Sequence, residues 1–259
     1  MTESPLFGLP SVVVTPHLGA STREAQDKAG DTIASMVELA LAGDFVPFAV
    51  NVNAAEANET IRPFLPLGER LGSLFESLVG ATPDVLEVSV EGEIAGYDTR
   101  ILELAVLKGF FGSITDDPVT YVNAPQLAKD HGLDVREVTC ATSVDYVNLL
   151  TVSGGGHKIS GTLSGPKASQ RVTNIDGVPF DVPPVDNMVV ITNDDRPGVI
   201  GTVGTLLGQA EVNIADMDVS RTDDDKAVML IAPTKPVPAP VLDELRGAPG
   251  IVSVKTLSA

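Results

Sequence analysis

The sequence contains no tryptophan, and aromatic residues make up only 4% of the chain. Proteins that bind single-stranded nucleic acid stack the bases on aromatic rings and neutralise the phosphates with cations. This chain has few rings and a formal net charge of −18. We therefore expect no nucleic-acid partner.

Cysteine is nearly absent too, since Cys140 is the only one. A single cysteine excludes an intrachain disulfide framework and a cysteine-based zinc site, and it suits a reducing cytoplasm. No basic region followed by an apolar run stands at the N-terminus, so no signal peptide is predicted. No apolar run approaches membrane-spanning length, so we expect a soluble, cytoplasmic chain without a membrane partner. No histidine and carboxylate cluster has metal-ligand spacing, so no metal is expected.

Apolar residues are plentiful enough for a sizeable core. Hydrophobic residues make up 43% and charged residues 20% of the chain, a composition typical of folded domains and not of wholesale disorder. The length of 259 residues is enough for two or three domains. We place them at 1–52, 53–185 and 186–259, and we expect a mixed α+β and α/β multidomain protein.

The first segment is predicted to hold one strand and one helix. Val12–Val14 is a short apolar run typical of a buried strand, and Ser21 with Glu24 forms a capping box at the start of the following helix. One strand and one helix make a poor domain alone, so we expect this segment to belong to a larger unit.

The middle segment is predicted to be a mixed α+β domain. Leu86, Val88 and Val90 alternate with polar residues, which indicates a half-buried strand. Hairpins are predicted at Gly154–Gly156 and at Asp176-Gly177.

The last segment shows the order strand, helix, strand, strand, helix, strand, which is the ferredoxin-like βαββαβ arrangement. Asp195 is predicted to cap the first of these helices, with Pro197 in its first turn. Gly198, Gly201, Gly204 and Gly208 leave that helix thin, which would let a sheet or a second copy of the chain approach it closely.

Four stretches carry a resemblance to a known family. VVVTPHLGAST at 12–22, VTYVNAPQLAKDHGL at 119–133, SGTLSGPKASQRVTNIDG at 160–177 and DRPGVIGTVGTLLG at 195–208 resemble D-3-phosphoglycerate dehydrogenases of the long, actinobacterial type. The resemblance implies the end of a catalytic region in 1–52, an intervening domain similar to an allosteric substrate-binding domain in 53–185, and an ACT domain in 186–259.

By this resemblance His17 is the catalytic acid/base. Its partner glutamate, the arginine that holds the substrate carboxylate and the glycine-rich dinucleotide fingerprint are not in this sequence. Gly154–Gly156 lacks the spacing of that fingerprint. NAD therefore belongs to the full-length family, and we expect no cofactor binding and no dehydrogenase activity from this chain alone.

The resemblance also implies an L-serine site in the ACT domain, shared across a dimer interface. A carboxylate at Asp195 suits the ammonium group, helix N–H groups suit the carboxylate, and the Asn213 amide suits the hydroxyl. Asn193 stands where the relatives have a bulkier aromatic residue. The plain alternative is that Asp195 is only a helix cap and Asn213 a turn residue. The implied set is Asn193, Asp195, Arg196, Pro197, Gly198, Asn213 and Ile214.

Lys158, Lys167 and Arg171 stand out in an acidic chain, and they suggest a site for an anionic effector or 3-phosphoglycerate. Arg171 matches a basic position of the family's effector pocket, whereas a second such position is Pro183 here. The alternative is three scattered, solvated cations.

Taken together, the residues and the resemblance predict the regulatory, C-terminal part of a D-3-phosphoglycerate dehydrogenase, whose parent activity oxidises 3-phosphoglycerate with NAD in L-serine biosynthesis. A homo-oligomer formed through the ACT domain is expected. Either the chain is a truncated gene product or an excised piece, or it is a stand-alone, non-enzymatic amino-acid-binding regulator. An oligomerisation module without a ligand is a further alternative.

Overall fold

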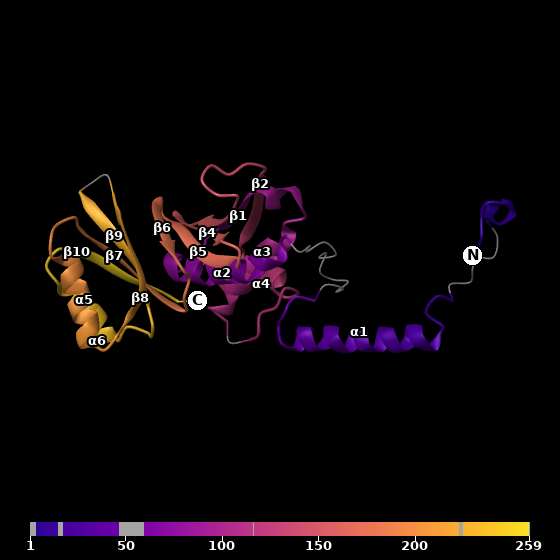
Figure 1. Cartoon of the computed structure of the whole chain (residues 1–259), viewed down its shortest axis with the longest axis horizontal. Helices are drawn as coiled ribbons and strands as arrows, with labels where there is room; N and C mark the ends of the chain where they lie inside the picture. The colour runs from indigo at the N-terminus through magenta and orange to yellow at the C-terminus, as the bar shows by residue number, and fades with distance from the viewer. Residues whose placement is uncertain (1–3, 15–17, 47–59, 116, 223–224, 259) are drawn as a thin grey trace. The chain divides into compact units, whose positions relative to one another are not determined.

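The computed structural model describes residues 4–14, 18–46, 60–115, 117–222 and 225–258 (Figure 1). Contacts divide the chain into two compact units, Met1–Val46 and Pro47–Ala259. In the described ranges, no helix is both long enough and apolar enough to cross a membrane.

The first unit contains the helix α1 (Arg23–Leu41) and a short 3-10 helix (Pro5–Gly8). The cap of α1 is Thr22, whose hydroxyl accepts from the Ala25 N–H, and not the predicted Ser21. The predicted strand at 12–14 is wrong: these residues form no strand, and Val13 is 90% exposed. A strand needs a neighbour to satisfy its backbone groups, and the described residues of this unit include no other strand.

The second unit begins with an α+β domain built on a six-stranded sheet. The strands lie in the order β2-β1-β3-β4-β5-β6, and the β1–β2 pair is parallel while the others are antiparallel. Both predicted hairpins are present, at Gly155-Gly156 and at Asp176-Gly177. The elements are α2 (Leu65–Val79), β1 (Val85–Gly92), α3 (Arg100–Gly112), α4 (Ala124–Asp130), β2 (Asp134–Cys140), β3 (Asn148–Gly154), β4 (His157–Ser164), β5 (Ser169–Ile175) and β6 (Val178–Val182), with short 3-10 helices at Arg62–Phe64 and Glu93–Gly96.

Two glycines let α2 and α3 touch through their backbones. A Cβ atom at Gly72 would lie 2.1 Å from the Val106 carbonyl oxygen, and one at Gly109 would lie 1.8 Å from the Glu69 carbonyl oxygen. Any side chain at either position would therefore force the two helices apart. This pair of helices covers the sheet face that buries Leu86, Val88, Val90, Leu150, Val152 and Ile159.

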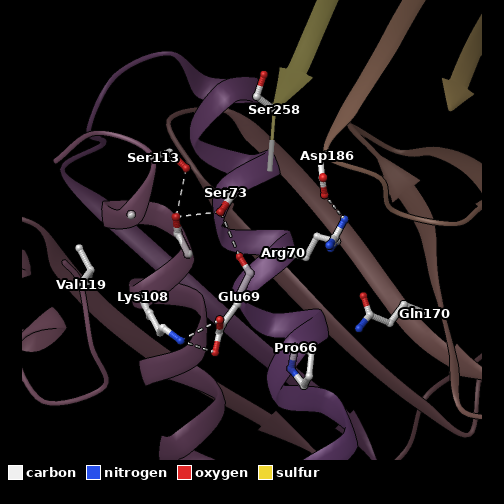
Figure 2. Close-up of a pocket in the computed structure, with 12 residues that line it drawn as sticks. Pro66, Glu69, Arg70, Ser73, Lys108, Ser113, Val119, Gln170, Asp186 and Ser258 are labelled. Atoms are coloured by element: carbon white, nitrogen blue, oxygen red, sulfur yellow. Dashed lines mark hydrogen bonds and ion pairs between the residues drawn. The ribbon is translucent and has the colours of Figure 1, made fainter. Parts of the chain in front are cut away.

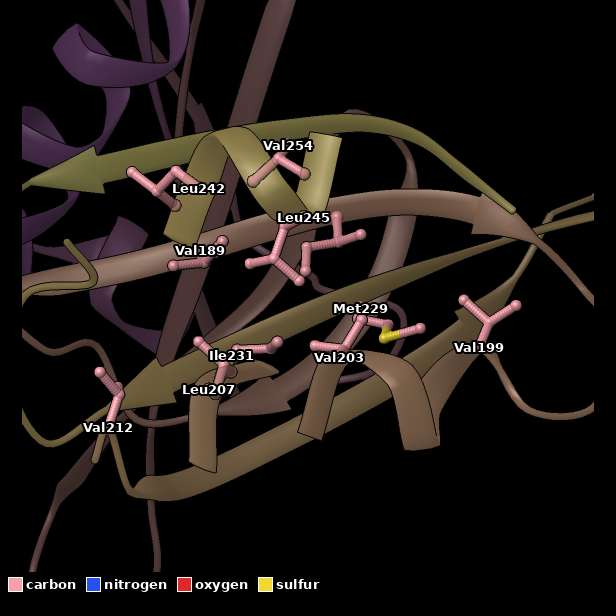
Figure 3. Close-up of a cluster of buried hydrophobic side chains, with 11 residues drawn as sticks. Val189, Val199, Val203, Leu207, Val212, Met229, Ile231, Leu242, Leu245 and Val254 are labelled. Atoms are coloured by element: carbon pink, nitrogen blue, oxygen red, sulfur yellow. The ribbon is translucent and has the colours of Figure 1, made fainter. Parts of the chain in front are cut away.

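The second sheet has four antiparallel strands in the order β10-β7-β9-β8, with α5 and α6 packed on its core. Figure 3 shows the aliphatic side chains of both helices meeting those of the sheet. The predicted βαββαβ order is confirmed. The elements are β7 (Asn187–Asp194), α5 (Val199–Gln209), β8 (Ile214–Arg221), β9 (Lys226–Pro233), α6 (Ala239–Gly247) and β10 (Ile251–Ser258).

Helix α5 begins later than predicted. Its N-cap is Gly198, in the left-handed region with a φ of 95°, and no side chain caps the helix. The prediction that Asp195 is the cap is therefore wrong, because Asp195 still belongs to the loop that follows β7. A Cβ at Gly201, Gly204 or Gly208 would meet nothing within 4 Å, so no strand among the described residues packs against the thin face of α5.

The two sheets of the second unit are joined at β6 and β8. The Asp181 N–H donates to the Asp218 carboxylate at 2.9 Å, and the Ser220 hydroxyl donates to the Pro179 carbonyl at 2.5 Å. On the helix side, the Lys255 ammonium donates to the Leu78 carbonyl. Polar contacts thus connect the two domains at two separate places, once between the sheets and once between β10 and α2.

The α2–α3 contact can be tested with Gly109→Ala. The added methyl group meets the Glu69 backbone, and overpacking of this kind costs about 1–3 kcal/mol of unfolding free energy. Chemical denaturation followed by circular dichroism measures the change.

The matched control is Gly112→Ala, at the end of the same helix, where a Cβ would meet nothing within 4 Å. Alanine favours helix over glycine by up to ~1 kcal/mol, so the control should be neutral or stabilising. Equal stability of both variants would contradict the close helix contact.

Candidate functional site

The loop after β7 is held by its backbone. The Asp194 N–H donates to the Gly250 carbonyl at 2.8 Å, and the Asp195 N–H donates to the Asp225 carbonyl at 3.1 Å. The Arg196 guanidinium lies over Gly250, where a Cβ would be 2.8 Å from one of its nitrogens. The loop conformation therefore does not depend on hydrogen bonds from the Asp195 side chain.

The Asp195 carboxylate is accessible but already has a partner. It lies 2.7 Å from the Arg221 guanidinium, whose side chain is 80% exposed. An ion pair this exposed contributes little, on the order of 0–1 kcal/mol, so an incoming ammonium group can compete with it. Arg196, Pro197 and Gly198 are exposed beside it, and the uncapped start of α5 leaves N–H groups available to an anion.

Asn193 is buried, with only 3% of its surface exposed. Its amide nitrogen donates to the Asp194 carbonyl at 2.8 Å, while its amide oxygen has no partner among the described residues. The buried Asn193 side chain thus supports the backbone of the loop through its bond to the Asp194 carbonyl, and it is not presented at the surface.

Asn213 is exposed at the opposite end of the sheet. Asp194 pairs with Lys226 at one end of β9, and Ile214 pairs with Pro233 at the other. Strand β9 is eight residues long, so its ends are roughly 23 Å apart at about 3.3 Å per residue. Within one copy of the chain, the structure does not bring Asp195 and Asn213 together around one small molecule.

The three basic residues of the middle domain are spread along the β4–β5 hairpin. Lys158 lies at the start of β4, and Lys167 lies in the turn beyond its end. The two are therefore roughly 20 Å apart. Arg171, on β5, lies opposite Thr162 in between.

Arg171 is engaged by acidic groups from both sheets. Its guanidinium lies 2.5 Å from the Asp181 carboxylate, also donates to the Asp181 carbonyl, and is 3.7 Å from the Asp216 carboxylate on β8. The side chain is 23% exposed. An anion at Arg171 would have to compete with these carboxylates, and Arg171 currently links the middle domain to the second sheet.

A groove that the sequence analysis missed lies beside α2 and α3, with a volume of about 560 Å³ (Figure 2). Its lining includes Arg70, Ser73 and Lys108, with Asp186 and Ser258 at its rim. Arg70 and Ser73 lie on α2, whereas Lys108, Asp186 and Ser258 come from distant parts of the sequence, and tertiary packing brings them together. No sequence motif marks them.

At the base of the groove, Glu69 is the centre of a compact polar cluster. Its carboxylate accepts from the Tyr121 hydroxyl at 2.5 Å and lies 3.0 Å from the Lys108 ammonium, which also stands 5.0 Å from the centre of the Tyr121 ring. Arg70 pairs with Asp186 at 2.9 Å. Lys108 and Arg70 are thus each paired with a carboxylate, so these two cations add no net positive charge to the groove.

Burial raises the pKa of Glu103, and the nearby Glu137 carboxylate raises it further. Burial also raises the pKa of Glu76 on α2. Neither residue lines the groove. In the described ranges, no group of three or more histidine, cysteine and acidic residues could hold a metal ion. His17, the predicted catalytic residue, lies outside the described residues.

The second sheet and its two helices form a domain of a known class. Residues 187–250 match the family model of the ACT domain. Residues 60–176 match the family model of the D-3-phosphoglycerate dehydrogenase intervening domain. The chain belongs to the D-3-phosphoglycerate dehydrogenase family. It spans about half the length of the curated relatives it matches.

Two relatives illustrate the match. A D-3-phosphoglycerate dehydrogenase of Mycobacterium leprae is 44% identical over 93% of this chain and 47% of its own length. One of Synechocystis is 36% identical over 98% of this chain and 47% of its own length. Both matches extend across the two domains described above.

The Glu69 cluster can be tested with Glu69→Gln. The substitution leaves the Lys108 ammonium, only 17% exposed, without its carboxylate, which should cost about 1–3 kcal/mol of unfolding free energy. Thermal and chemical unfolding at neutral pH measure the loss.

Glu76→Gln on the same helix is the matched control, because burial already disfavours the charged form of that carboxyl. It should be neutral or stabilising. Equal losses for both variants would show that the cluster contributes no specific stability.

Proposed function

We propose that this chain is the regulatory part of an NAD-dependent D-3-phosphoglycerate dehydrogenase and that its ACT domain senses L-serine. The parent reaction would be the oxidation of 3-phosphoglycerate to 3-phosphohydroxypyruvate in serine biosynthesis. Family membership and the two matched domains support this proposal. The single cysteine and the metabolic role are consistent with a cytoplasmic location.

The separation of Asp195 and Asn213 carries the proposal for the serine site. Their positions at opposite ends of β9 mean that one serine molecule can contact both only if each comes from a different copy. Two such sites would form around a two-fold axis, as expected for a symmetric dimer. The effector would then also stabilise the homo-oligomer, because ligand binding and association are linked.

Each group of serine has a suitable partner in this arrangement. The Asp195 carboxylate would take the ammonium in place of Arg221, and the uncapped N–H groups at the start of α5 would take the carboxylate. Asn213 of the second copy would bond the hydroxyl. Arg196, Pro197, Gly198 and Ile214 would shape the walls.

We also propose a second effector site, for an anion, at Arg171. Lys158 and Lys167 would add positive electrostatic potential along the β4–β5 hairpin. The observation that favours it is the partial exposure of the Arg171 guanidinium between the two sheets. Binding of an anion such as 3-phosphoglycerate there would displace Asp216, so it would alter the link between the middle domain and the ACT domain.

Serine binding can be tested by complementation. Calorimetric titration of the purified chain should show binding, and Asp195→Ala and Asn213→Ala should each abolish it. Mixing the two variants should restore binding, because a mixed dimer combines both defects in one site and leaves the other intact.

The control is Asp243→Asn, which changes an exposed carboxylate on α6 that pairs with Arg246, and it should bind serine as the wild type does. Failure of the mixture to bind, while both variants remain folded and dimeric, would contradict a site shared between copies.

The chain alone should not oxidise substrate. His17 has no partner glutamate or dinucleotide fingerprint in this sequence. Incubation of the purified chain with NAD and 3-phosphoglycerate should give no increase in absorbance from NADH. Formation of NADH at a rate proportional to the protein concentration would overturn this part of the proposal.

A further inference from the structure

The six-stranded sheet has a second face, directed away from α2 and α3. On β1 the side chains alternate, so that Leu86, Val88 and Val90 are fully buried on the helix side while Glu87 and Ser89 point the other way. Such an outer face is normally covered with exposed polar side chains. Here it is hollowed into a pocket of about 420 Å³, within the range typical of small-molecule sites.

The floor of this pocket is made of side-chain hydroxyl groups. They are buried, although they lie on the face of the sheet that the helices do not cover. Thr151 is 8%, Ser160 3% and Thr173 4% exposed. Ser89 lies opposite Thr151 and Thr151 lies opposite Ser160, so the hydroxyls form a row across adjacent strands. The Thr151 and Ser160 oxygens are 2.8 Å apart and bond each other.

Two hydroxyls that line the pocket have no partner. The Ser143 oxygen, on the loop between β2 and β3, and the Thr173 oxygen, on β5, are buried and form no hydrogen bond among the described residues. A buried hydroxyl without a partner costs about 1–3 kcal/mol, and valine has nearly the same shape as threonine without that cost. Both residues line the same pocket, so a molecule seated there would be a partner for them.

The charges around the pocket restrict what that molecule can be. Glu87, Glu91 and Asp145 contribute three carboxylates, against the single ammonium of Lys158. An anion would be repelled. Carboxylates accept hydrogen bonds and hydroxyls both donate and accept, so the lining suits a neutral molecule that carries several hydroxyl groups.

We propose that this pocket, formed by the row Ser89, Thr151 and Ser160 with Thr173 and the loop residue Ser143, binds a small uncharged polyol of about monosaccharide size. The ring of Tyr146, 37% exposed on the loop, supplies an aromatic surface at the rim. The proposal is independent of the serine site, because no residue of the ACT domain lines the pocket.

The test is a binding screen of the purified chain by saturation-transfer NMR and thermal shift, with glycerol, ribose, glucose and myo-inositol as probes. Inorganic phosphate is the anionic probe. At least one polyol should bind with a dissociation constant in the millimolar range or tighter and raise the melting temperature, whereas phosphate should produce no competing effect. If none of the four polyols binds, or if phosphate displaces the one that does, the proposal is overturned.

Thr173→Val then locates the site. The variant should bind the polyol at least tenfold more weakly, and its ligand-free melting temperature should equal or exceed that of the wild type, because it loses only an unpartnered hydroxyl. Thr139→Val, on the exposed part of β2, is the matched control and should bind as the wild type does.

Glu87→Gln, on the exposed side of the pocket, is a second variant that should also weaken polyol binding. Unchanged affinity in both Thr173→Val and Glu87→Gln would place the polyol elsewhere. A clearly lower melting temperature for ligand-free Thr173→Val would mean that the hydroxyl has an internal partner, and would also overturn the proposal.

Discussion

The backbone contact between α2 and α3 is the constraint on which the middle domain depends. Gly72 and Gly109 remove the side chains that would separate the helices. The resulting proximity places the Glu69 carboxylate against Lys108 and Tyr121 and lets the Ser73 hydroxyl donate to the Gly109 carbonyl at 2.9 Å. The same helices cover the face of the sheet that buries Leu86, Val88 and Val90, and the hydroxyls of Thr151 and Ser160 bond each other on the other face.

Strand β8 carries contacts that join the ACT domain to the middle domain. This strand carries Asp216, which reaches Arg171, and Asp218, which accepts from the Asp181 backbone. Its first residue, Ile214, follows Asn213, and its last, Arg221, pairs with Asp195. One strand therefore connects both halves of the proposed serine site with the middle domain. A ligand that moves Arg221 or Asn213 acts on the strand whose other side chains hold the two sheets together.

Hairpins and alternating strands could be predicted from the sequence because local rules decide them. Gly155 and Gly156 both adopt positive φ, as a two-residue turn between antiparallel strands requires. The prediction that Asp195 caps α5 is wrong. An aspartate followed two positions later by a proline is typical of a helix start, whereas α5 has its N-cap at Gly198. The serine-site residues stay a prediction. The groove beside α2 could not be predicted: Glu69 and Lys108 lie 39 positions apart and meet only through tertiary packing. The prediction of a strand at 12–14 is wrong because an apolar run alone does not form a strand. The described residues of the first unit include no strand with which it could pair.

The loop after β7 is fixed by main-chain bonds to Gly250 and Asp225, and the side chains of Asp195 and Arg196 extend from a frame they do not build. Substitutions at these two positions should therefore leave the main-chain frame of the loop in place. For the proposed effector site, this means that ligand specificity can change by substitution of Asp195 and Arg196 over evolutionary time, while the fold of the domain stays the same.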